Sequence, residues 1–124
     1  MKRTFVGTLL AVILATLAIS PALAQSHQPG SDMCPHDPTI SSLQTCIGHM
    51  EEMEFIDSAG VANSLQAKLA AAQSAQDRGQ SDVTVQMLTA LVHQVEAQSG
   101  KHIAEPHASH IVQHVEMVIL ELAS

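Results

Sequence analysis

Aromatic side chains are nearly absent from this 124-residue chain, which contains two Phe and no Tyr or Trp. Only Phe55 lies beyond the N-terminal apolar run. Aromatic faces supply the large flat apolar surfaces on which many binding sites are built. Their scarcity weakens a sugar-binding interpretation, and it predicts a core made of aliphatic side chains.

Basic residues are almost as scarce. After Ala24 the sequence has 12 acidic residues but only three basic ones, Lys68, Arg78 and Lys101, which gives a net charge of −9 with His neutral. Nucleic acids and anionic membrane surfaces attract Lys and Arg, so this balance argues against both as partners. It favours cationic partners or metal ions.

The chain has a single long apolar run, Phe5–Ile19, and it lies near the N-terminus. Met1–Arg3 precedes it with positive charge, and Ala22–Ala24 follows with the small residues that signal peptidase reads. This pattern predicts a signal peptide over residues 1–24 that is cleaved before Gln25. The run is short for a bilayer span, which needs about 20 residues. We therefore expect an exported protein, extracellular or periplasmic, with no stable membrane insertion after cleavage.

The remainder is predicted to be a flexible lead-in over 25–36 followed by one helical domain over 37–124. Helix starts are predicted at Asp37-Pro38, after Asp57–Gly60, at Ser81 and at Pro106, where capping residues or Pro precede apolar residues at helical spacing. The four apolar stripes are Ile40, Leu43, Ile47 and Met50; Val61, Leu65, Leu69 and Ala72; Val85, Leu88, Leu91, Val92 and Val95; and Ile111, Val115, Val118, Ile119 and Leu122. Gly79 and Gly100 are predicted helix stops. No segment alternates with period two, so we expect an all-α, compact four-helix bundle.

Several short pieces of this sequence occur together in a known family. They are Ile56-Asp57, Gly60-Val61-Ala62-Asn63-Ser64-Leu65, Ala67-Lys68-Leu69, Asp77-Arg78-Gly79 and Val95-Glu96-Ala97-Gln98-Ser99-Gly100-Lys101-His102-Ile103. In this order they resemble the FIMAH domain over roughly residues 56–119. The resemblance implies a small helical module of exported bacterial proteins, without catalytic residues. The chain departs from the usual pattern in its His-rich last helix.

Cys34 and Cys46 are the only cysteines. An even count in an exported protein predicts one disulfide. The alternative is a metal site formed by Cys34, His36, Cys46 and His49, which are ligand types that zinc takes, although the spacing is not a standard one. A catalytic Cys46–His49 pair is disfavoured because a disulfide leaves no thiolate nucleophile.

Three histidines of the last helix, His107, His110 and His114, fall within about 60° of one another on one face, and Met117 continues that edge. One interpretation is that they border the core and hydrogen-bond to neighbouring helices. A second is a transition-metal site for Cu, Ni or Zn, with Met117 or Met50 as a further ligand for Cu(I). A third is a pH sensor, because several imidazoles would gain charge on acidification.

The sequence shows no nucleophile–base set, phosphate loop or paired acids that can be placed together, so we expect no enzyme. The leading hypothesis is a non-enzymatic exported helical module that mediates binding to an unknown extracellular or cell-surface partner. The alternative is an extracytoplasmic protein that binds Cu, Ni or Zn through the His face of the last helix.

Overall fold

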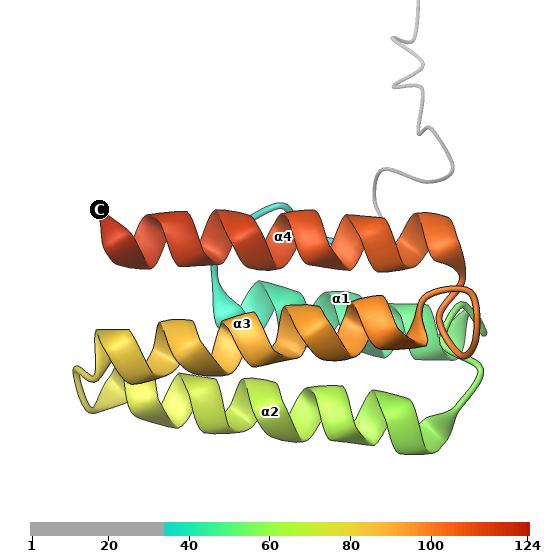
Figure 1. Ribbon diagram of the computed structural model, residues 1–124, viewed down its shortest axis with the longest axis horizontal. Coiled ribbons are helices and arrows are strands. Elements are labelled where there is room, and N and C mark those ends of the chain that lie inside the picture. The colour runs from blue at the N-terminus through green and yellow to red at the C-terminus, as the bar shows by residue number, and fades with distance from the viewer. Residues whose placement is uncertain (1–33) are drawn as a thin grey trace, which may run out of the picture.

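The fold consists of four packed helices. The computed structural model describes residues 34–124, so the predicted signal peptide and most of the predicted lead-in lie outside the described residues. The helices are α1 (Ile40–Glu52), α2 (Ala59–Asp77), α3 (Ser81–Gln98) and α4 (Glu105–Ala123). Successive helices run in opposite directions (Figure 1). Within this part of the chain only isolated β-bridges occur, which confirms the all-α fold.

The helices close into a ring in which each one packs against two others. α2 contacts α1 and α3, and α4 contacts α3 and α1. The apolar stripes predicted from the sequence face the interior, because each helix has one apolar face that must be removed from water. The exception is in α3, where Thr84 is buried and Val85 is only half-buried. The largest buried aliphatic side chains are Ile40, Leu43, Ile47, Met50, Ile56, Leu65, Leu69, Leu88, Leu91, Ile103 and Ile111. The core is therefore aliphatic, as the composition predicts.

Three helix starts differ from their predictions. α2 begins at Ala59 with Ser58 as its N-cap, and not after Gly60. The N-cap of α1 is Thr39, whose side chain accepts a hydrogen bond from the Ser42 amide, and not Asp37. The Asp37 carbonyl accepts instead from the Thr39 amide at 2.8 Å, which makes a tight turn before the helix. The last helix begins at Glu105, one residue before the predicted Pro106, which lies in the first turn where its missing N–H costs nothing.

The helix stops follow their predictions. Gly79 and Gly100 have φ values of 72° and 71°, in the left-handed region that glycine adopts without strain. At the other end of α1, Glu54 has a φ of 61°, which is uncommon for a residue with a side chain. It turns the chain from α1 into the loop before α2.

Two loops are joined at one end of the bundle. Ile56 and Ile103 form an isolated antiparallel bridge, the Ala104 amide donates to the Phe55 carbonyl, and the Asp57 amide donates to the His102 carbonyl. The loop before α2 and the loop before α4 therefore hold each other. None of the helices in residues 34–124 has the length and apolar character needed to cross a bilayer.

Candidate functional site

The predicted disulfide is present. Cys34 and Cys46 are bonded, with their Cα atoms 4.5 Å apart, and both side chains are buried. The bond fixes the start of the described chain against α1. Ser42 adds a second tie, because its hydroxyl donates to the Pro35 carbonyl at 2.8 Å. The last residues of the predicted lead-in are thus held on the helices.

His114 is a core residue with 1% of its surface exposed. Its Nε2 lies 2.8 Å from the Asp37 carbonyl oxygen and 3.0 Å from the Ser42 hydroxyl oxygen. A carbonyl only accepts, and the Ser42 proton already goes to Pro35, so Nε2 carries the hydrogen and donates. Nδ1 is then an acceptor, and among the described residues it has no hydrogen-bond partner. His114 therefore joins α4 to α1 and to the segment before it.

His110 is half-buried and lies against the disulfide. One of its ring nitrogens and the sulfurs of Cys34 and Cys46 all lie within 4.8 Å of one another. In residues 34–124 this is the one group of three or more His, Cys, Asp or Glu side chains with such spacing. The pKa of His110 is lowered, first by burial and then by the neighbouring imidazoles of His36, His114 and His107.

The other members of the predicted His face have different surroundings. The His107 ring stacks on Phe55, with ring centroids 3.8 Å apart and planes inclined by 22°. Met117 is 39% exposed. The three histidines of α4 therefore line one side of the helix but contact three different neighbours: an aromatic ring, a disulfide and a backbone carbonyl. A metal site made from His107, His110, His114 and Met117 stays a prediction.

His36 reaches the same place from the segment before α1. Its ring lies edge-on to the His110 ring, with centroids 5.8 Å apart. The metal site considered from the sequence combines the two cysteines with His36 and His49. In the structure, the histidine whose ring nitrogen lies within 4.8 Å of both sulfurs is His110. Sequence spacing could not reveal this, because Cys46 and His110 lie on helices that are far apart in the sequence.

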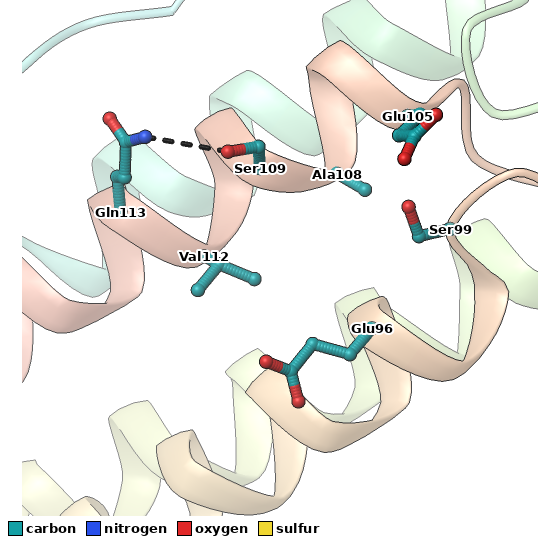
Figure 2. A pocket seen from close by; sticks show the side chains of 7 residues that line it. All are labelled: Glu96, Ser99, Glu105, Ala108, Ser109, Val112 and Gln113. Carbon is teal, nitrogen blue, oxygen red and sulfur yellow. Dashed lines mark hydrogen bonds between the residues drawn. The ribbon is translucent and has the colours of Figure 1, made fainter.

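A groove of about 290 Å³ runs between α3 and α4. It is lined by Glu96, Ser99, Glu105, Ala108, Ser109, Val112 and Gln113. Figure 2 shows Glu96 of α3 facing Val112 of α4 at one end, with Glu105 beside Ser99 at the other. The groove thus has carboxylates on both sides of an apolar floor made by Ala108 and Val112, and no Lys or Arg lines it. Its side chains are ordinary surface residues in the sequence, so sequence reasoning did not single them out.

The position of His114 in the sequence does indicate that its side chain is buried. His114 is three residues after Ile111 and four before Val118, so it falls inside the apolar stripe of α4 and not only beside it. A polar residue at such a position is buried and needs a hydrogen-bond partner. The partner, a backbone carbonyl of the segment before α1, depends on the tertiary fold and was not predictable.

The comparisons with known proteins identify a domain family. The family model described as the FIMAH domain matches residues 40–120, which is most of the described chain and extends the resemblance noted in the sequence to include α1. Neither curated proteins nor solved structures give a match.

Proposed function

The chain belongs to the FIMAH domain family, and from this premise we propose that it is a non-enzymatic exported module that binds a basic segment of an extracellular or cell-surface partner. The observation that carries the proposal is the groove between α3 and α4. We propose that one Lys or Arg side chain of the partner lies in this groove.

The chemistry of the groove fits such a side chain. Lys and Arg have an apolar stem and a charged head, and they bury the stem along apolar surface while the head stays near water or a carboxylate. The Ala108–Val112 floor suits the stem, and Glu96 or Glu105 suits the head. Ser99 and Ser109 add hydroxyl oxygens that accept hydrogen bonds from an ammonium or guanidinium group.

The charge of the whole chain supports the same partner. With 12 acidic and three basic residues after Ala24, the exported protein would attract cationic segments before contact and accelerate their association at low salt. Export itself is supported by the sequence pattern at the N-terminus and by the Cys34–Cys46 disulfide, since disulfides persist in oxidising compartments. Because both cysteines are in that bond, neither offers a thiolate for covalent catalysis.

The test is a titration of the purified protein with short Lys- and Arg-containing peptides, using acidic peptides of equal length as the negative probe. The double change Glu96→Gln and Glu105→Gln removes both groove carboxylates. Glu116→Gln with Glu121→Gln is the matched control, because it removes the same charge from exposed positions of α4 outside the groove. The groove variant should bind basic peptides at least about fivefold more weakly, which corresponds to about 1 kcal/mol, and the control should differ little from the unchanged protein.

Equal weakening in the two variants would contradict the groove proposal. It would show that the peptides respond to the overall negative charge, which attracts any cation without a site. Raising the salt concentration separates the same two cases, since screening removes long-range attraction before it removes contacts within a groove.

The second candidate function is binding of Cu, Ni or Zn through the His face of α4. The alignment of His107, His110 and His114 on one helix favours it. Replacing all three would damage the fold because His114 is buried, so the informative variants are His107→Ala and His110→Ala. Isothermal titration of the oxidised protein with each metal should show one-to-one binding that either change abolishes; binding that survives both would exclude this face as the site.

A further inference from the structure

We propose that Cys34, Cys46 and His110 form a redox-gated metal site, which holds a thiophilic d¹⁰ ion such as Zn(II) or Cu(I) when the disulfide is reduced. This site is separate from the acidic groove between α3 and α4, and of the His face of α4 it uses His110 alone. It combines the two sulfurs, which the fold brings to α4, with the one imidazole of that helix that lies against them.

The distances fit tetrahedral coordination. Two thiolates and an imidazole bound to one zinc ion lie roughly 3.5–3.8 Å apart, given Zn–S bonds of about 2.3 Å and a Zn–N bond of about 2.0 Å. The ring nitrogen of His110 and both sulfurs already lie within 4.8 Å of one another. Reduction frees the sulfurs to separate while both cysteines stay anchored, Cys46 in the middle of α1 and Cys34 next to Pro35, whose carbonyl is hydrogen-bonded to Ser42.

The charge balance also fits. Cys34 and Cys46 are buried, and a buried thiolate without a partner is costly. A divalent ion with two thiolates and a neutral imidazole forms a group with no net charge, which a half-buried position tolerates. The acidic surface of the chain favours the approach of the cation.

His36 is the candidate for the fourth ligand of the ion. It stands two residues after Cys34, and its exposed ring lies edge-on to the ring of His110, with centroids 5.8 Å apart. We assign the open side of the ion to an imidazole nitrogen of His36, because this ring is the exposed neighbour of His110. The set would then be Cys₂His₂, closed as structural zinc sites are; without His36 the position would take water.

The gating step is thiol–disulfide exchange with a dithiol reductant. A thiolate of the reductant attacks one sulfur of the Cys34–Cys46 bond and forms a mixed disulfide, and the second thiol of the reductant then displaces the protein sulfur. The reductant leaves as its own disulfide, oxidised by two electrons, and the protein keeps two thiols. Binding of Zn(II) releases the two thiol protons to water. A disulfide oxidant, such as the oxidised form of the same dithiol, reverses the exchange: it takes two electrons from the protein thiolates and two protons from water, the Cys34–Cys46 bond forms again, and the ion is released.

The experiment compares the oxidised protein with protein reduced by a phosphine, each titrated with Zn(II) alone and with Co(II) as a spectroscopic probe. We expect one ion per reduced chain with a micromolar or tighter dissociation constant, a thiolate-to-Co(II) charge-transfer band, and protection of both thiols from a thiol reagent. His110→Ala should weaken binding at least about tenfold. His93→Ala, which removes an exposed histidine of α3, should leave the affinity within twofold.

Two results would overturn the proposal. One is a reduced protein that keeps its helical circular dichroism but binds no Zn(II) at micromolar concentration. The other is binding that His110→Ala and His93→Ala affect equally, which would show that the cysteine pair alone captures the ion, in a folded or an unfolded chain. His36→Ala decides the fourth position: a further loss of affinity assigns it to His36, and no loss assigns it to water.

Discussion

At the scale of single residues, His114 is one of the side chains that hold the segment before α1, together with the Cys34–Cys46 disulfide and Ser42. Its Nε2 donates to the Asp37 carbonyl and lies 3.0 Å from the Ser42 hydroxyl oxygen, and its ring is buried. His114→Ala would remove one of the two donors to that carbonyl, which then keeps only the Thr39 amide, and would open a cavity in the core. We expect the free energy of unfolding to fall by about 2–4 kcal/mol.

Urea denaturation measures this loss, and His93→Ala is the matched control. His93 is an exposed helical histidine whose Nδ1 lies 3.6 Å from a carboxylate oxygen of Glu96, so its removal should change the free energy of unfolding by less than about 0.5 kcal/mol. Similar values for the two variants would mean that the buried hydrogen bonds of His114 contribute no more than a surface contact.

His110 gives a second prediction at this scale, because it titrates abnormally in the metal-free, oxidised protein. Burial and the imidazoles of His36, His114 and His107 lower its pKa from the ordinary value of 6.5. The unfolded chain therefore binds a proton at His110 more readily than the folded one, so this residue makes the protein less stable as the pH falls below 6.5. NMR titration of the imidazole should show the lowered pKa, and His36→Ala should raise it, since one neighbouring charge is removed. An unchanged pKa in that variant would exclude His36 as a cause and leave burial with the imidazoles of His114 and His107.

At the scale of elements, glycines at two kinds of position should respond to alanine with opposite signs. Gly79 ends α2 with a φ of 72°, where a Cβ meets no atom within 4 Å but the backbone conformation itself is strained for alanine. Gly79→Ala should therefore lower the free energy of unfolding by about 1–2 kcal/mol. Gly48 lies inside α1, and its Cβ would sit 3.9 Å from Gln66 Nε2, an ordinary contact. Gly48→Ala should raise stability by about 0.5–1 kcal/mol.

Thermal unfolding of the two variants, compared with the unchanged protein, checks the signs. A loss of stability in Gly48→Ala would show that α1 and α2 pack too closely there for a methyl group. A gain in Gly79→Ala would show that the left-handed turn after α2 is not required.

The same elements show what the sequence could and could not predict. Helical spacing of Leu65, Leu69, Leu88 and Leu91, together with the glycine stops, was enough for four helices and an aliphatic core, because these are local patterns. The start of α1 was missed because Thr39 caps the helix, while the Asp37 carbonyl accepts from Thr39 and from His114 of a helix far away in the sequence. The approach of His110 to the disulfide was missed for the same reason. Local periodicity predicts which face of a helix is buried, but it does not predict which distant segment covers that face.

At the scale of the whole molecule, acidic charge is spread over a small aliphatic bundle. The chain has little basic charge with which to pair its carboxylates, so most of them remain solvated and repel one another. A bundle of this size also has a limited core to oppose that repulsion. The disulfide between the start of the described chain and α1 is the covalent element that offsets both.

Replacing both Cys34 and Cys46 with alanine tests this role. The bond closes a loop with a sequence separation of 12, and in the chain-entropy account its loss should lower the free energy of unfolding by about 3 kcal/mol. The effect acts through the unfolded state, so the dependence of that free energy on urea should become steeper while the helical signal of the native protein is unchanged.

Adding Zn(II) separates the structural role of the disulfide from the proposed metal site. It should restore about 2–3 kcal/mol to the phosphine-reduced native sequence at one hundred times the dissociation constant. It should restore nothing to the double variant, which has no thiolates. Equal recovery in both would place the ion elsewhere in the molecule and leave the disulfide as a purely structural bond.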